Sequence, residues 1–146
     1  MKKAVFSLLL YLCFFVSVFQ AYGQEKYNVH ALEDFKHSLE SLVKGDYDNA
    51  ILYSSYVLRR DPDSSVAYTV RARAYFEKGD MTNAITDCTQ AINCDKNNVS
   101  AYLIRANAHA RNGSVNRAVS DWKAVLRINP ENADAINNIQ LATNAQ

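Results

Sequence analysis

A seven-residue stretch occurs three times in this chain at a constant interval. It spans residues 45–51, 79–85 and 113–119, so successive copies begin 34 residues apart. Each copy starts with glycine, carries alanine five residues later, and has a β-branched apolar residue directly after that alanine. A period of about 34 residues, with a glycine between two helical stretches, predicts an array of helix-turn-helix units.

Residues outside this stretch follow the same period. Pro62 and Pro130 are two periods apart, and Tyr68 and Tyr102 are one period apart. With these residues in step, the sequence resembles the tetratricopeptide repeat family over residues 31–132, without a gap. The resemblance implies an all-α fold, an α-solenoid of three helix-turn-helix repeats with six helices, followed by a solvating C-terminal helix.

The repeats set the expected domain boundaries. The three repeats would cover residues 31–64, 65–98 and 99–132, and a capping helix would lie within residues 133–146. Helices are predicted near 31–44, 48–60, 65–78, 82–94, 99–112, 116–128 and 133–143. Pro62 and Pro130 end the helices before them, because proline lacks the amide hydrogen that a continuing helix donates. The last helix has Ala135, Ile139 and Ala142 on one stripe, which suits a lid over the third repeat.

Residues 1–23 are predicted to be a secretory signal peptide, and residues 24–30 a short leader. Lys2 and Lys3 precede an apolar run over residues 4–19, and Ala21-Tyr22-Gly23 offers a small-residue cleavage site. An uncleaved membrane anchor is the alternative, although the run is shorter than the roughly 20 residues that span a bilayer. A lipoprotein signal at Cys13 ranks last. We therefore expect an exported protein, periplasmic or at the cell envelope, with a eukaryotic secretory lumen or the extracellular space as the alternative.

The charge of the expected mature chain argues against nucleic acid as a partner. The full sequence has 16 basic and 15 acidic residues, and loss of Lys2 and Lys3 leaves the chain close to neutral. Affinity for nucleic acid comes largely from a cationic face. The chain contains no long run of like charges that could supply such a face.

Few residues occur in the patterns that catalysis, metal binding or a disulfide requires. His30, His37 and His109 lack the cysteine or carboxylate partners of a zinc-type spacing. Cys88 and Cys94 are six residues apart on one expected helix, too far and too differently oriented for a disulfide. The sequence contains no nucleophile elbow and no phosphate-binding glycine loop. We therefore expect no catalysis, no cofactor, no metal site and no small-molecule substrate.

The resemblance also implies a binding site. Tetratricopeptide arrays generally hold a segment of a partner protein in a concave groove lined by the first helix of each repeat. The matching positions here are Phe35, Leu39, Val66, Val70, Arg73, Leu103, Ile104 and Asn107. A subfamily that binds acidic chaperone tails carries a clamp of basic and amide residues. At its five clamp positions this chain has Phe35, Leu39, Val70, Ser100 and Ile104, none of them a clamp residue.

The predicted function is a non-catalytic protein interaction scaffold that binds an apolar or amphipathic segment of a protein whose identity the sequence does not give. The alternative is a structural subunit whose groove is buried in a homo-oligomer or larger envelope complex, which a concentration-dependent mass would reveal. Some groove residues could instead pack inside the array. The first repeat also leaves two alternatives open. It has Asp34 and Ser41 where the second has Tyr68 and Tyr75, so its first helix is either rotated or turns apolar side chains into the groove.

Overall fold

Seven helices follow one another along residues 29–144, the part of the chain that the computed structural model describes, and no strand occurs among these residues. The first helix covers residues 29–43. The others are α2 (Tyr47–Arg60), α3 (Ser65–Glu77), α4 (Met81–Cys94), α5 (Val99–Arg111), α6 (Val115–Ile128) and α7 (Ala133–Asn144). The bounds of α2 to α7, and the end of the first helix, lie within two residues of the positions predicted from the period. The expected signal and most of the leader, residues 1–28, lie outside the described residues.

The turn inside each repeat is built on its glycine, and in the first two repeats the residue after the glycine caps the next helix. Gly45, Gly79 and Gly113 have φ of +74°, +84° and +73°, a left-handed conformation that glycine adopts without a Cβ penalty. Asp46 and Asp80 then cap α2 and α4 by accepting hydrogen bonds from backbone amides three residues on. Hydrogen bonds from the following asparagine lower the pKa of both aspartates. Each turn therefore reverses the chain at a fixed point.

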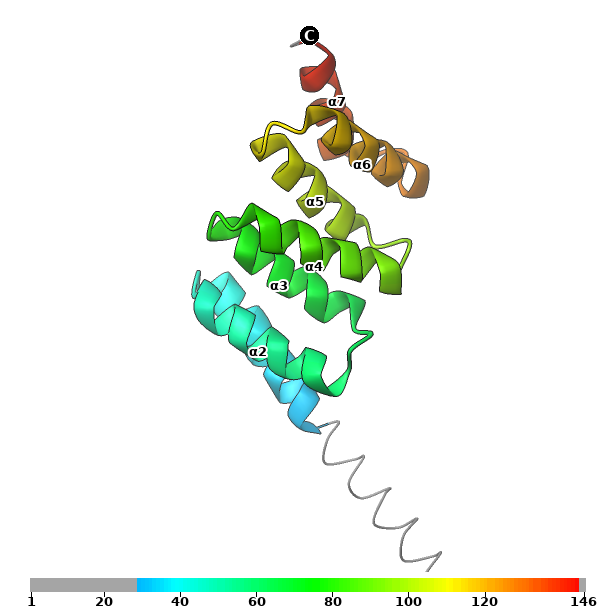
Figure 1. The fold of residues 1–146 in the computed structure, drawn as a ribbon. Helices are drawn as coiled ribbons and strands as arrows, with labels where there is room; N and C mark the ends of the chain where they lie inside the picture. Colours follow the sequence, from blue (N-terminus) through cyan, green and yellow to red (C-terminus); the bar gives the residue numbers. More distant parts are fainter. Residues whose placement is uncertain (1–28, 145–146) are drawn as a thin grey trace, which may run out of the picture.

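The helices stack in chain order. Each described helix from α2 on packs against the next, and α3 also lies against α5 (Figure 1). Contact between α3 and α5 means that the first helices of consecutive repeats are neighbours. The first helices therefore form one continuous side of the array, the side on which the groove is expected.

Small side chains allow the helices to approach closely. Ala50, Ala84 and Ala118, the alanines of the three motifs, are fully buried. Four residues later in each second helix, the buried side chain grows along the array, from Ser54 to Cys88 to Trp122. The C-terminal repeat therefore has the largest apolar side chain in this position, and Trp122 belongs to the cluster that α7 completes with its buried Ala135.

Two arginines connect neighbouring repeats. Arg71 on α3 donates from Nε and Nη2 to the carboxylate of Asp87 on α4, at 2.7 and 2.9 Å, and from Nη1 to Ser55 on α2 at 3.0 Å. One period later, Arg105 makes the same bonds to Asp121 and Thr89. The hydrogen bonds that the arginines donate to the aspartates raise the pKa of both arginines, although burial opposes this. We call these two three-helix networks the arginine clasps.

The first repeat keeps the register of the others. Ser38 is fully buried, as are Ala72 and Ala106 at the equivalent positions. The helix of residues 29–43 is therefore not rotated about its axis, which decides between the two alternatives left open by the sequence. Its apolar residues Leu39 and Val43 are exposed as a result.

The place of a clasp is taken in the first repeat by two aromatic rings. His37 and Tyr53 occupy the positions equivalent to Arg71 and Asp87, and their ring centroids are 5.1 Å apart. Asp34, equivalent to Tyr68, forms an ion pair with Arg60 at the end of α2. Polar side chains at these positions suit the end of an array, where they face no preceding repeat in the described chain.

A candidate interaction groove

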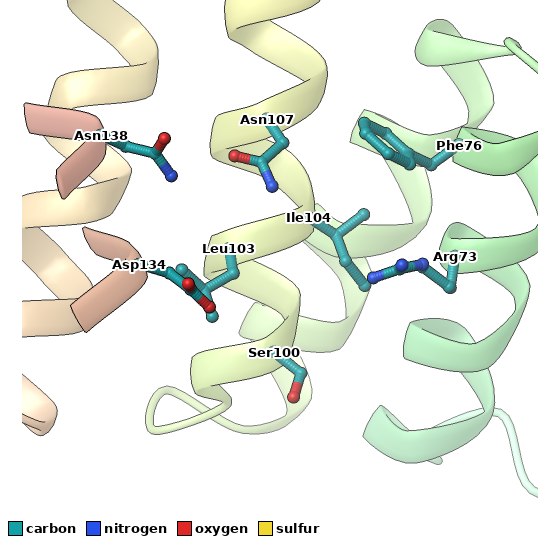
Figure 2. Close-up of a pocket in the computed structure, with 8 residues that line it drawn as sticks. All are labelled: Arg73, Phe76, Ser100, Leu103, Ile104, Asn107, Asp134 and Asn138. Atoms are coloured by element: carbon teal, nitrogen blue, oxygen red, sulfur yellow. The ribbon is translucent and has the colours of Figure 1, made fainter. Parts of the chain in front are cut away.

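A hollow of about 360 Å³ opens between α3, α5 and α7. Figure 2 shows its lining side chains converging from these three helices. The residues that line it are Arg73, Phe76, Ser100, Leu103, Ile104, Asn107, Asp134 and Asn138. Four of them, Arg73, Leu103, Ile104 and Asn107, were predicted as groove residues from the sequence. The structure thus brings half of the predicted set to one concave site.

On the α3 side of this hollow, two arginine guanidinium groups lie near the aromatic ring of Phe76. Arg73 Nε donates to Glu77 Oε1 at 2.7 Å, so its charge is paired within the helix. The Arg111 guanidinium lies 4.1 Å from the centroid of Phe76, and that of Arg73 lies 6.0 Å from it. Both distances are within the range of cation–π attraction. This wall is therefore preorganised by ion pairing and stacking.

The α7 wall was missed by the sequence analysis. Asp134 and Asn138 lie four residues apart on the capping helix, one turn of the same face, and both line the hollow. In Figure 2 the side chains of Asn138 and Asn107 extend into the space between α7 and α5. The sequence signal that could have found this wall is the period, because Asp134 and Asn138 lie 34 residues after Ser100 and Ile104.

The other four predicted residues lie nearer the N-terminal end and differ in exposure. Leu39 is 39% exposed and Val66 is 55% exposed, so both are available to a partner. Val70 is buried, and Phe35 is half-buried against the Val57–Leu58 cluster of α2. The last two residues contribute mainly to packing inside the array, as does Ile104, which is buried in the central core.

The two ends of the groove have different chemistry at equivalent positions. Leu32 is 70% exposed and stands where the third repeat has Ser100, and Leu39 stands where it has Asn107. We call the exposed residues Leu32, Leu39, Val43 and Val66 the apolar end of the groove. We call Arg73, Ser100, Asn107, Asp134 and Asn138 its polar end.

The remaining candidate residues have local contacts. His30 and His37 lie 3.4 and 3.8 Å from Glu33 and Glu40 on the same helix. No cluster of three metal-binding side chains occurs among residues 29–144. Nor does any helix in this range have the length and apolar character needed to cross a membrane.

The two described cysteines are both free and differ in their surroundings. Cys88 is buried in the core position predicted from the repeat register, and Cys94 is exposed at the end of α4. Burial raises the pKa of the Cys88 thiol to about 12, so this thiol stays protonated and behaves as a small apolar side chain.

Comparison with known proteins agrees with this architecture. A family model described as TPR repeat matches residues 72–113, from the second half of α3 to the turn before α6. The first TPR domain of Spaghetti (RPAP3), solved with an HSP90 peptide, superposes with a TM-score of 0.76 at 29% identity, covering 79% of this chain and 91% of that one. Residues 72–113 thus match the tetratricopeptide-repeat family, and the described helices on either side continue the same tandem array. No curated protein matches its sequence at a significant level.

Other tetratricopeptide-repeat structures show the same array. The second TPR domain of human RPAP3, solved with an HSP70 peptide, gives a TM-score of 0.76 at 26% identity and covers 80% of this chain and 98% of its own. The Arabidopsis OM64 TPR domain gives a TM-score of 0.80 at 22% identity, covering 82% and 99%, and supports the fold alone. Two of these three structures were solved with a bound peptide, and all three share the repeat array described here.

Proposed function

We propose that this chain is an exported, non-catalytic scaffold that binds an apolar or amphipathic segment of a partner protein in its groove. The observation that carries the proposal is the apolar end, where Leu32, Leu39 and Val66 are exposed on the groove side of the first two repeats. Contiguous exposed apolar side chains on a soluble surface mark interaction sites more often than chance. The polar end would fix the register of the bound segment through its amide and carboxylate groups.

An acidic chaperone tail is a poor fit for this groove. The Spaghetti and human RPAP3 domains are described with HSP90 and HSP70 peptides that end in Glu-Glu-Val-Asp. In this chain the five matching clamp positions carry apolar or hydroxyl side chains, and Leu39 among them is exposed. Arg73 is the one cation among the described residues that line the hollow, and it is already paired with Glu77. A partner with apolar side chains suits the groove better.

The export part of the proposal rests on residues 1–23 of the sequence, with the periplasm or cell envelope as the expected location. Its test is mass spectrometry of the chain recovered from its native cells. A mature N-terminus at Gln24 in the envelope fraction would support export. An intact N-terminus in the cytosolic fraction would contradict it.

The groove part of the proposal is tested by selecting ligands from a displayed peptide library on the purified full chain. We expect the selected peptides to be apolar or amphipathic, and to lose binding to a Leu39→Glu, Val66→Glu variant. Both side chains are exposed, so the substitutions should leave the fold intact, which a circular-dichroism melt checks. Leu52→Glu, at an exposed leucine on α2 away from the groove, is the matched control.

Two results would contradict the groove proposal. One is selection of peptides whose binding survives the Leu39→Glu, Val66→Glu change and fails with Leu52→Glu. The other is a stable oligomer in which the groove is covered, seen as a mass that rises with concentration and falls back in the groove variant. The second result would favour the structural-subunit alternative.

A further inference from the structure

The exposed side of the helix of residues 29–43 has a regular spacing. Val29, Leu32, Lys36, Leu39 and Val43 follow one another at intervals of three, four, three and four residues. The four apolar members are all exposed. Alternating intervals of three and four are the spacing by which one helix presents a seam to a second helix packed along it. We call these five residues the N-terminal seam.

The equivalent positions of the later repeats do not form such a seam. One period on, they are Asp63, Val66, Val70, Arg73 and Glu77, and Val70 is buried there. Two periods on, they are Asn97, Ser100, Ile104, Asn107 and Arg111, and Ile104 is buried. Only the first of the three repeats therefore offers an apolar line that runs the length of a helix, about 20 Å at 1.5 Å per residue.

Lys36 lies at the centre of this seam. Its ammonium is 3.7 Å from the Glu40 carboxylate, and its side chain is 72% exposed. A helix that covered the seam would remove water from this ammonium, and Glu40, at 3.7 Å, is beyond hydrogen-bond distance, in contrast to the 2.7 Å pair of Arg73 and Glu77. Covering the seam is therefore most favourable when the partner supplies a second, closer opposite charge. An acidic side chain at the centre of the partner's seam would meet that requirement with a charge-assisted hydrogen bond.

We infer that the N-terminal seam docks a helix of a different protein, whose apolar seam carries an acidic residue opposite Lys36. The inference rests on the proposed function and specifies its partner as helical. A second copy of this chain does not satisfy the seam. In a parallel pair, and in an antiparallel pair centred on the seam, Lys36 would face Lys36 with both charges desolvated. The chain's own apolar run, residues 4–19, contains no acidic residue for Lys36 either.

The test uses three labelled peptides and the full chain. Two peptides are amphipathic helices about three heptads long with leucine along the seam, one with glutamate and the other with lysine at its central position. The third has the composition of the glutamate peptide in scrambled order. Fluorescence anisotropy at low salt gives the dissociation constants. Sedimentation of the chain alone reports any self-association.

We expect the glutamate peptide to bind the wild type about tenfold more tightly than the lysine peptide. Lys36→Glu should reverse that preference, and Leu39→Ser should weaken both peptides about tenfold. Leu52→Ser, at the exposed leucine of α2, should change neither affinity, and the scrambled peptide should not bind. Added salt should reduce the difference between the two helical peptides.

Equal affinity for the two helical peptides, or no response to Lys36→Glu, would overturn the inference. A dimer that dissociates on Leu39→Ser would overturn it as well, because the seam would then be occupied by a second copy. A further outcome is that no helical peptide binds, while library-selected peptides still require Leu39 and Val66 for binding. That outcome would refute the helical partner but would be consistent with the proposed function.

Discussion

The first repeat and the third repeat place different chemistry on the same backbone positions. On the groove side the first repeat exposes Leu32 and Leu39, where the third has Ser100 and Asn107. In the buried slot of the second helix the first repeat has Ser54, where the third has Trp122. The first repeat therefore places apolar surface outside the array, and the third places it inside. This contrast suggests that the N-terminal end serves binding while the C-terminal end supplies stability.

The largest difference between the two repeats is expected when the buried side chain of the second helix, Ser54 or Trp122, is replaced by alanine. Trp122→Ala should lower the free energy of unfolding by about 4 kcal/mol, because it leaves a large cavity between α6 and α7. Ser54→Ala should cost less than about 1.5 kcal/mol, since it removes only the hydroxyl that donates to the Ala50 carbonyl at 2.6 Å. Urea denaturation of both variants gives the difference.

A control separates volume from hydrogen bonding at Trp122. Its indole N–H has no hydrogen-bond partner among the described residues. Trp122→Phe therefore loses no hydrogen bond and should cost well under half of what Trp122→Ala costs. A similar decrease in the free energy of unfolding for Ser54→Ala and Trp122→Ala would contradict the view that the C-terminal end supplies the stability.

Breaking an arginine clasp should cause the next largest loss of stability. Asp87→Ala should destabilise the array by about 3 kcal/mol, because Arg71 is left partly buried without its carboxylate. His37→Ala, at the position of Arg71 in the first repeat, should cost about 1 kcal/mol or less, since this half-exposed side chain makes a tilted ring contact to Tyr53 and a 3.8 Å approach to Glu40. Thermal and urea unfolding of the two variants measure both values.

An apolar replacement of the Arg71–Asp87 pair is the matched control for that experiment. The double change Arg71→Met, Asp87→Leu removes both charges and should recover a large part of the stability lost in Asp87→Ala. A His37→Ala loss as large as that of Asp87→Ala would show that the first repeat is clasped as firmly as the second.

A smaller effect is expected on the groove side. Leu39→Ser should change the free energy of unfolding by less than about 0.5 kcal/mol, because the side chain is exposed. The same change should weaken a library-selected peptide about tenfold. Val70→Ala, on the buried side of α3, should show the reverse pattern, with a stability loss of about 1–2 kcal/mol and little change in affinity. A large stability loss in Leu39→Ser would show that the apolar end supports the fold.

The smallest expected effect is the pH dependence that His109 contributes in the third repeat. Burial lowers the pKa of His109, with Asp121 opposing and Arg105 and Arg117 assisting. The unfolded chain therefore binds a proton more readily than the folded chain as pH falls through about 6.5. His109 should thus reduce stability between about pH 7 and pH 5, by less than about 0.5 kcal/mol.

Comparing wild type with His109→Gln at the two ends of that pH range isolates the contribution. The wild type should lose slightly more stability than the variant on acidification. The first repeat has Ser41 at the equivalent position and no such contribution. An identical pH dependence in both proteins would contradict the predicted sign.

The sequence predicted the fold closely because the determinants of this fold are local and repeated. Gly45, Gly79 and Gly113 mark the inner turns, and the buried alanines mark the close helix contacts. Each signal recurs after 34 residues, so an ambiguous position could be interpreted from its equivalents. That is why both ends of α2 to α7 lie within two residues of those predicted.

The groove was predicted less completely, because exposure depends on which face each helix turns to its neighbours. Val70 and Leu39 are both apolar groove positions by resemblance, yet Val70 is buried and Leu39 is exposed. Asp134 and Asn138 lie one period after Ser100 and Ile104, so the repeat register could have found them; they were missed because α7 was considered only as a cap. The difference between Val70 and Leu39 arises from tertiary packing, which a one-dimensional period does not encode.

Methyl NMR of the full chain with a library-selected peptide tests the central claim most directly. The groove and the surface outside it both carry exposed leucine and valine methyl groups, so one experiment reports on both. The account predicts that the methyl signals of Leu32, Leu39 and Val66 shift on titration, while those of Leu52 on α2 and Leu141 on α7 do not. Shifts at Leu52 or Leu141 with unchanged groove signals would contradict it.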